Sequence, residues 1–307
     1  MPAIEHATGA PVTVTRIPRP DEPVPAIAAP AALVFVGGLA LWGASTALAL
    51  TGAWPLLAAV LPNAVASYLL FTVAHDASHR SLSSHEAVNV WLGRVSLFFF
   101  APQAGFRTWR FIHMQHHRFT NHDDGRDPDQ YTHRGPRWQL VPRWLTIDLY
   151  YLRWYAPQLG SRPRRERIEL AVFWALLIAV VVAAVLGGLG LELVVLYLLP
   201  MRLAIGWLGL AFDYLPHNGL HLTPSEDRFK TTRNRVGLER LLSPLLLYQN
   251  YHLVHHLHPT IPFHRYLAVW RRHEDRYLDG DPELTDVRGR AITADEYRRL
   301  RELAEHH

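Results

Sequence analysis

The longest uncharged run in the chain limits its fold more than any other feature. No Asp, Glu, Lys or Arg occurs from Pro23 to Ala74. A membrane-spanning helix needs about 20 apolar residues, so this run is long enough for two spans, at residues 26–50 and 54–74, with a turn at "TGAWP". We therefore predict a helical hairpin in a membrane. A hairpin buried in a soluble protein is the alternative, and the length of the run disfavours it.

A second apolar block, residues 168–215, predicts another hairpin that turns within "LGGLGLE". One charged residue, Arg202, lies inside its second span. A charge at this depth usually faces the interior of the helix bundle or water. Arg202 is therefore a candidate substrate-binding residue for a polar substrate end, or a partner of a backbone carbonyl or of Glu192. The expected fold class is an all-α integral membrane protein with about four transmembrane helices.

Histidines gather in four short clusters outside these spans. Two clusters have the pattern HxxxH, in "HDASH" and "HNGLH", and two have the pattern HxxHH, in "HMQHH" and "HLVHH". Residues three and four apart share one face of a helix, and imidazole is the commonest metal ligand at neutral pH. A single pair can be incidental, but four clusters predict a metal site. The ten candidate ligands are His75, His79, His113, His116, His117, His217, His221, His252, His255 and His256.

The clusters are expected on one side of the membrane. His75 follows the second span and His217 follows the fourth, and fourteen arginines lie between residues 75 and 167. Another fourteen Lys or Arg lie in residues 228–301, whereas the hairpin turns have none. Because basic residues concentrate in cytoplasmic segments, we expect both termini and a helical cap with the metal site on the cytoplasmic side. Ten imidazoles exceed what one ion takes, which indicates two ions.

The absence of cysteine removes several kinds of site. Disulfides, thiolate ligands, iron–sulfur clusters and P450-type haem ligation are excluded. Imidazole suits iron, zinc, copper or nickel, but the HExxH motif of zinc proteases does not occur. A histidine-rich metal transporter is the remote alternative from another class. It would place its ligands along the spans, whereas these histidines gather at one end.

The order of these motifs resembles the membrane fatty acid desaturase and hydroxylase superfamily. The likeness extends from about residue 71 to residue 270. The stretches "AHDASHRSL", "HMQHHRFTN" followed by "RDPDQY", "DYLPH" and "QNYHLVHHLHPTIPF" are most similar to bacterial carotenoid ring hydroxylases of the β-carotene hydroxylase type, with a more distant likeness to carotenoid ketolases. The resemblance implies that the candidate histidines other than His221 hold two iron ions. His221 fits the acyl desaturase pattern, in which a histidine lies four residues after an Asn or His.

The resemblance also implies the reaction. Such an enzyme uses O2 and two electrons at two iron ions to oxidise an unactivated C–H bond of a lipophilic substrate. Hydroxylation of a carotenoid ring is the expected outcome, and fatty acyl desaturation is the alternative because both share the iron site. Asp76 and Asp127 are expected to accept imidazole N–H groups and so orient the ligands.

Electrons must come from another protein. The chain has no GxGxxG motif, no cysteine cluster and no haem-binding segment, so a ferredoxin-like donor is expected. A sequence pI near 9.5 favours an acidic donor. The other partners are the lipophilic substrate and the membrane, with no nucleic acid. We expect residues 1–25 to form a flexible tail, 26–277 the membrane domain and 278–307 a cytoplasmic C-terminal tail.

Overall fold

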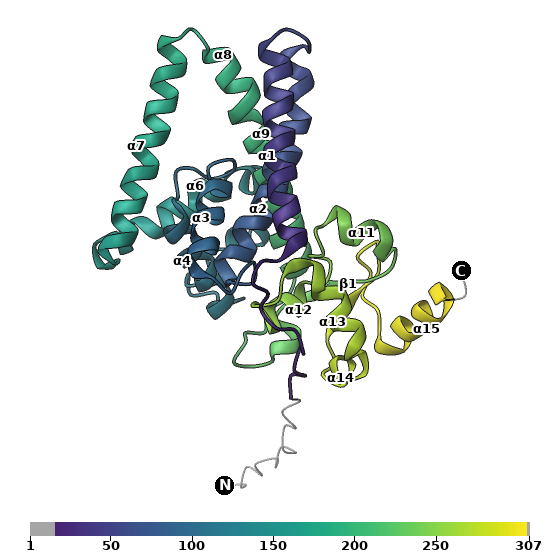
Figure 1. The fold of residues 1–307 in the computed structure, drawn as a ribbon. Coiled ribbons are helices and arrows are strands. Elements are labelled where there is room, and N and C mark those ends of the chain that lie inside the picture. The colour runs from purple at the N-terminus through teal and green to yellow at the C-terminus, as the bar shows by residue number, and fades with distance from the viewer. Residues whose placement is uncertain (1–15, 306–307) are drawn as a thin grey trace.

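Helices make up almost all of the regular structure (Figure 1). The computed structural model describes residues 16–305. Its α-helices are α1 (Ala29–Leu50), α2 (Val60–His79), α3 (Glu86–Leu97), α4 (Phe106–Phe119), α5 (Gln130–His133), α6 (Leu140–Tyr155), α7 (Arg164–Leu186), α8 (Gly190–Leu193), α9 (Leu199–Leu208), α10 (Leu215–His217), α11 (Glu239–Leu245), α12 (His252–Leu257), α13 (Tyr266–Arg272), α14 (Glu274–Leu278) and α15 (Ala294–Glu305). Its two strands are β1 (Arg233–Arg235) and β2 (Glu283–Thr285).

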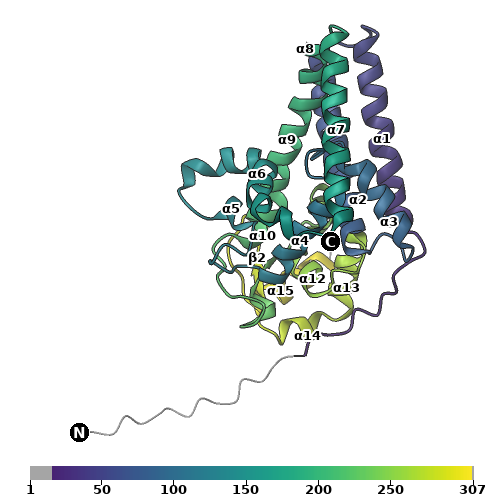
Figure 2. The same ribbon diagram turned by 90° about the vertical axis from the view of Figure 1, so that its left-hand side faces the viewer.

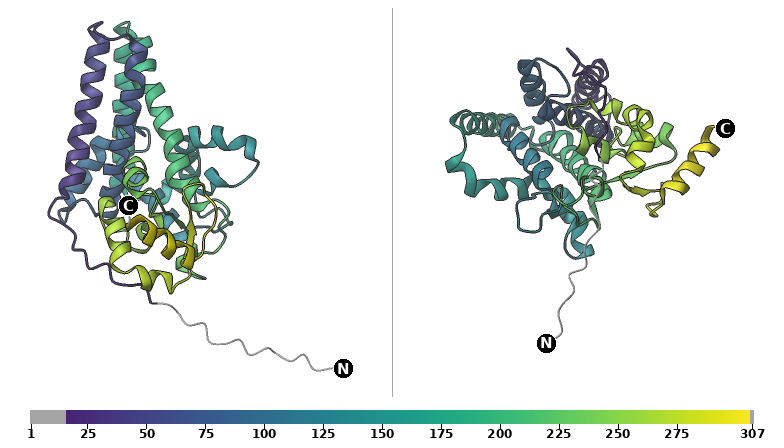
Figure 3. Two further views of the ribbon diagram at one scale, coloured as in Figure 1. Left: turned by 90° about the vertical axis from the view of Figure 1, so that its right-hand side faces the viewer. Right: turned by 90° about the horizontal axis from the view of Figure 1, so that it is seen from below.

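Four helices are long and apolar enough to cross a membrane. They cover Ala29–Leu50, Leu56–His79, Arg164–Leu186 and Gly190–His217. These helices rise together from one end of the molecule, and the remaining elements gather at the other end (Figures 1 and 3). The prediction of an all-α membrane protein with about four spans is confirmed.

The first and third spans expose apolar side chains over much of their length. On α1, Leu33 and Val36 are exposed, and on α7 so are Ile168, Val172 and Leu176. Apolar surface of this kind is stable against lipid tails rather than water. The second and fourth spans are half buried, because α2 packs against both α1 and α9.

A buried asparagine links three of these elements. Asn63 of α2 is fully buried, and its Nδ2 donates hydrogen bonds to the Leu196 carbonyl at 2.7 Å and to Thr46 Oγ1 at 3.1 Å. Its Oδ1 accepts a hydrogen bond from Ser45 of α1. Leu196 lies in a π-helical turn, η4 (Val194–Leu198). Polar contacts between helices in a membrane are stable because no water competes for them, so this contact fixes the first, second and fourth spans together.

The start of α4 is fixed by α7. Gly105 has φ +67°, and a Cβ there would lie 3.4 Å from Leu170 Cα of α7. Glu169 then accepts the backbone N–H of Arg107 at 2.8 Å, which satisfies one of the unpaired donors that open every helix. This contact places the "HMQHH" histidines of α4 beneath the spans.

A small parallel sheet of β1 (labelled in Figure 1) and β2 (labelled in Figure 2) holds the C-terminal segment against the cap. Asn234 of β1 pairs with Leu284 of β2, and Asn234 Oδ1 accepts the N–H of Leu253 in α12 at 3.0 Å. Within the segment expected as a C-terminal tail, Tyr297 is buried and its hydroxyl accepts the indole N–H of Trp270 at 2.8 Å. The segment therefore packs on β1 and α13, which both contact α12, the helix of the last histidine cluster.

The expected N-terminal tail is described from Arg16 onward, and residues 1–15 lie outside the described part. Glu22 forms an ion pair with Arg272 at 2.7 Å. The N–H of Ser84 donates to the Pro25 carbonyl at 2.8 Å. Residues 16–28 thus lie along the cap before the chain enters α1.

Candidate metal centre

Nine of the ten candidate histidines meet in two groups. Four elements bring them together: the end of α2, the C-terminal half of α4, α10 and α12. Within each group the ring nitrogens lie within 4.8 Å of one another. The first group is His75, His79, His113, His117 and His255, and the second is His116, His217, His252 and His256.

Each HxxHH motif contributes to both groups. On α4, His113 and His117 are four residues apart and belong to the first group, while His116 belongs to the second. On α12 the division is reversed, since His255 joins the first group and the pair His252 and His256 joins the second. The extra histidine in HxxHH, compared with HxxxH, therefore lets one helix turn serve two adjacent sites.

The ring nitrogens approach each other as closely as hydrogen-bonded atoms. Four Nε2–Nε2 distances are short: 2.7 Å for His79 and His113, 2.9 Å for His117 and His255, 3.1 Å for His217 and His252, and 3.1 Å for His252 and His256. All nine rings are buried or half-buried.

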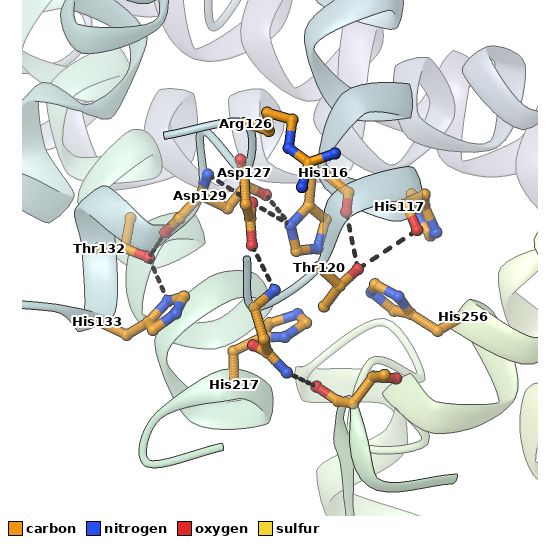
Figure 4. Close-up of polar contacts among 12 residues, drawn as sticks. His116, His117, Thr120, Arg126, Asp127, Asp129, Thr132, His133, His217 and His256 are labelled. Atoms are coloured by element: carbon orange, nitrogen blue, oxygen red, sulfur yellow. Dashed lines mark hydrogen bonds and ion pairs between the residues drawn. The ribbon is translucent and has the colours of Figure 1, made fainter. Parts of the chain in front are cut away.

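Three of the rings are oriented through their other nitrogen. His116 Nδ1 lies 2.9 Å from Asp127 Oδ1 (Figure 4). His252 Nδ1 lies 2.7 Å from Gln249 Oε1, and His255 Nδ1 lies 2.9 Å from the hydroxyl oxygen of Tyr266. An imidazole whose Nδ1–H donates to oxygen presents the lone pair of Nε2, and these Nε2 atoms point into the groups.

This arrangement fits bound metal ions. Two Nε2 lone pairs that face each other repel, and a cation between them removes the repulsion. The ring nitrogens of His75 have no hydrogen-bond partner within the described residues, although the side chain is 1% exposed. Buried polar atoms are nearly always satisfied, so His75 also fits a ligand role. An all-imidazole donor set suits iron, zinc, copper or nickel.

Burial keeps most of these imidazoles neutral, as metal ligands must be. It lowers the pKa well below the ordinary value for five rings outside the spans: His113, His117, His252, His255 and His256.

His116 behaves differently from the other rings. Burial lowers its pKa, but the nearby carboxylates of Asp129 and Asp127 outweigh burial and raise the pKa to about 9. Burial in turn raises the pKa of Asp129 to about 6. In the absence of metal, His116 therefore holds a proton that a metal ion must displace.

The tenth candidate, His221, lies away from both groups. Its side chain is exposed, and its Nδ1 lies 2.9 Å from Nη1 of Arg134. The helix ends at His217, and Gly219 follows with φ +79°. The four-residue spacing between His217 and His221 therefore does not put both rings on one helix face.

Asp76 is buried beside the first group but does not hold an imidazole directly. Its Oδ2 accepts the backbone N–H of Phe263 at 3.1 Å. Its Oδ1 is 3.8 Å from His75 Nδ1, which is longer than a hydrogen bond. Asp76 thus ties the end of α2 to the loop after α12.

Arg202 forms an ion pair across the bundle. Its Nη1 lies 2.8 Å from Asp148 Oδ1 of α6 and 3.0 Å from the Leu145 carbonyl. Nη2 contacts Asp148 Oδ2, which also accepts a hydrogen bond from Gln103. The charge is therefore neutralised by Asp148 and not by Glu192.

A cavity adjoins both histidine groups. Its walls include the side chains of Phe71, Trp109 and Phe212, and three carboxylates also face it, those of Asp129, Asp148 and Asp213. The cavity thus offers an apolar space with a few polar groups beside the histidines, the usual composition of a small-molecule site.

Comparison with known proteins gives the family of the chain. The sequence model described as "Fatty acid desaturase" matches residues 52–287. The chain belongs to the fatty acid desaturase family. The expected resemblance to the membrane desaturase and hydroxylase superfamily is confirmed, and the family is known for di-iron sites.

Curated relatives of this desaturase-family chain include carotenoid enzymes and desaturases. A β-carotene ketolase from Paracoccus sp. (strain N81106 / MBIC 01143) is 34% identical over 253 residues, which cover 76% of the chain and 89% of the relative. A β-carotene ketolase from Paracoccus sp. (strain PC1) is 30% identical over 64% of the chain and 71% of the relative. The omega-3 fatty acid desaturase fat-1 of Caenorhabditis elegans is 31% identical over 94 residues, 30% of the chain and 21% of the relative.

Family membership makes the chain a multi-pass membrane protein and an oxygen-dependent oxidoreductase. The alternative of a metal transporter is therefore wrong, and the chain is an enzyme. In the structure the histidines gather at one end of the spans, and not along them as a transporter would require.

Several residues that contact the histidines of the desaturase-family site were not predicted from the sequence. Gln249 and Tyr266 contact His252 and His255. Gln249 stands only three residues before His252, but it lies outside α12, so its contact depends on the turn that precedes the helix. Tyr266 lies eleven residues beyond His255 and reaches its Nδ1 at 2.9 Å. Asp129 was visible in "RDPD", but its 3.4 Å approach to His116 Nδ1 depends on the fold of that loop. Such contacts follow from tertiary structure and leave no local signal.

Proposed function

We propose that this enzyme oxidises a ring carbon of a carotenoid, with O2 and two electrons, first to the alcohol. The single observation that carries the proposal is the cavity beside the histidine groups, whose aromatic walls suit a hydrocarbon ring. The two relatives that cover most of the chain support the choice of substrate, since both are β-carotene ketolases.

We propose that iron occupies the two groups, held by the nine histidines His75, His79, His113, His116, His117, His217, His252, His255 and His256. Bound iron supplies the activation of O2 that breaks an unactivated C–H bond. In the balanced reaction, one oxygen atom enters the C–H bond and the other leaves as water, with two electrons and two protons from outside.

The protein's own residues orient the reaction. Asp127, Gln249 and Tyr266 fix the rings of His116, His252 and His255. Trp109 stacks on His113 with ring planes 6° apart, and Phe71 and Phe212 close the apolar side of the cavity. A hydrocarbon ring held there excludes water from the histidine groups.

Further oxidation to a ketone is the second candidate outcome. Asp213 faces the cavity from a π-helical turn, η5 (Gly209–Tyr214), four residues before His217. No hydrogen bond or ion pair to its carboxyl is present among residues 16–305. An alcohol formed in this cavity would find an acceptor in Asp213, and an alcohol retained beside the metal is available for a second oxidation at the same carbon. The names of the two Paracoccus relatives favour the same outcome.

Acyl desaturation remains the competing reaction, because the histidine groups serve either chemistry. The match with this chain covers 21% of the omega-3 desaturase of Caenorhabditis elegans but 89% of the first Paracoccus ketolase. The extent of the match favours the carotenoid.

We further propose that the metal centre and both termini face the cytoplasm, where a ferredoxin-like protein supplies the electrons. The arginines and lysines of residues 75–167 and 228–301 support this orientation. The excess of basic residues over acidic ones would attract an acidic donor.

The test is product analysis in a host that makes β-carotene. The chain is expressed with a ferredoxin and its reductase, and pigments and fatty acids are extracted for mass spectrometry. A carotenoid with oxygen on its ring, absent when His255→Ala is expressed to the same level, supports the proposal. New double bonds in acyl chains with unchanged pigment would replace it with the desaturase reaction.

A further inference from the structure

A second hollow lies between α3 and α7, away from the histidine groups. Its volume is about 760 Å³, and it shares no lining residue with the cavity beside the histidine groups. Val95 and Phe99 line one side, and Ile168, Val172 and Leu176 line the other. We call it the α3–α7 groove.

One wall of the α3–α7 groove is a continuous apolar stripe. Ile168, Val172 and Leu176 are four residues apart on α7, so they share one helix face. Each is at least 50% exposed. Because α7 is a membrane span, this stripe lies in the hydrocarbon region, where an acyl chain covers it.

The other end of the groove is positively charged. It is lined by Arg94, Arg107, Arg165 and Glu169. Glu169 is fully occupied, because its Oε2 lies 3.0 Å from Arg94 Nε and 3.1 Å from Arg107 Nε, and its Oε1 accepts the Arg107 backbone N–H. One carboxylate thus balances one of three guanidinium groups.

Of the three arginines, Arg165 is the one most available to bind an external anion. It lies one helical turn before Glu169, its side chain is exposed, and no carboxylate or hydrogen-bond acceptor contacts it within residues 16–305. It belongs to the first turn of a span, where the lipid headgroups of a bilayer lie. Basic pockets between membrane helices bind anionic headgroups.

We propose that the α3–α7 groove binds an anionic glycerophospholipid, with its phosphate at Arg165 and Arg107 and an acyl chain along the Ile168–Val172–Leu176 stripe. A neutral hydrocarbon substrate would use the stripe but would gain nothing from the uncompensated arginines. The charge therefore selects a lipid with a net negative headgroup.

The proposed lipid has a mechanical consequence for the site. α7 is the least buried of the four spans, and among the α-helices its main neighbours are α4 and α8. A lipid in the groove bridges α3 and α7 beside Arg107, the second residue of α4. It thus supports the packing of α7 on the helix that carries His113, His116 and His117.

The test uses the full-length protein in detergent and native mass spectrometry. Phosphatidylglycerol or phosphatidylcholine with the same acyl chains is added at equal concentrations. We expect at least one phosphatidylglycerol adduct that survives activation conditions removing phosphatidylcholine. Arg165→Gln should weaken retention of phosphatidylglycerol about fivefold, the size expected for one basic residue at a lipid headgroup.

Arg167→Gln is the matched control, because Arg167 is exposed on the same turn of α7 but does not line the groove. A second variant, Val172→Trp, fills the apolar end and should weaken retention of both lipids. Metal content of each variant, unchanged from the parent protein, checks that it is folded.

Equal retention of the two lipids by the unaltered protein would overturn the proposal without the need for any variant. Equal losses in Arg165→Gln and Arg167→Gln would also overturn it, because they would assign the binding to general surface charge.

Discussion

Asp127 holds His116 by a 2.9 Å contact between Oδ1 and the ring Nδ1, and its second oxygen accepts the backbone N–H of Asn121 at 2.8 Å. The side chains of Asp127 and His116 are almost fully buried. The carboxylate thus joins the end of α4 to the loop that follows, and the direction of the imidazole depends on both contacts.

Replacing Asp127 should therefore weaken metal binding without removing a ligand. Asp127→Asn loses the charge that keeps Nδ1–H of His116 oriented, and loss of such a partner typically lowers metal affinity about 10–100-fold. Competition with a chelator of known affinity measures the change. Asp124→Asn, an exposed residue of the same loop paired with Arg126, is the control and should bind metal normally. Equal affinities in all three proteins would contradict the role of Asp127.

Tyr266 should control the ring of His255 in the first group. Tyr266→Phe removes the hydroxyl that lies 2.9 Å from Nδ1 and leaves the buried ring in place. We expect turnover to fall about tenfold or more while the protein still folds. Tyr248→Phe is a suitable control, since the Tyr248 hydroxyl makes no hydrogen bond among the described residues. An equal fall in turnover in both variants would contradict the role of the Tyr266 hydroxyl in orienting His255.

The two histidines of "HNGLH" should behave in opposite ways. His217→Ala deletes a member of the second group and should reduce metal content. His221→Ala alters an exposed ring that lies beside Arg134 and should leave metal content unchanged. Metal per chain, measured by inductively coupled plasma mass spectrometry on both variants, distinguishes them. Loss of metal from His221→Ala would restore His221 to the ligand set.

The Arg202–Asp148 pair should show strong coupling. Removing one partner leaves an uncompensated charge in the bundle, which for a buried pair costs about 3–5 kcal/mol. Arg202 is 28% exposed, so we expect the lower end of that range. Arg202→Leu and Asp148→Leu should each lower the melting temperature in detergent, and the double variant should recover much of the loss. Additive losses would show that the two charges act independently.

His258 should make the fold sensitive to acid. Burial lowers its pKa to about 4, whereas the unfolded chain has the ordinary value of about 6.5. Between these values the unfolded state binds the proton first, so stability is complete above pH 6.5 and falls by up to about 3 kcal/mol as pH drops to 4. His258→Gln should therefore show a flatter dependence of melting temperature on pH across this window. An unchanged slope would mean that His258 does not titrate on unfolding.

The spans and the histidine groups were predictable because their signals are local. An uncharged run such as residues 23–74 has few alternatives to membrane helices, and the spacing of His252, His255 and His256 places them on one or two turns of any helix. His221 was the exception. Its spacing from His217 predicted a shared helix face, but the helix ends at His217 and the chain turns at Gly219.

Contacts between distant segments could not be read from the sequence. Arg202 was recognised as a buried charge, but its partner Asp148 lies on α6, far from it in the chain. Tyr266 likewise reaches His255 only because of the way the loop after α12 folds. Asp76 stands next to His75 in the sequence, yet its carboxylate turns toward the backbone of Phe263.

The metal content of the purified protein tests the central claim most directly. The chain is produced in medium that supplies iron and zinc, extracted in mild detergent, and analysed for both metals together with its absolute protein concentration. The two groups of imidazoles predict two metal ions per chain, and the proposed di-iron centre predicts that both are iron. One ion per chain, or zinc in place of iron, would contradict the assignment of the two groups as a di-iron centre.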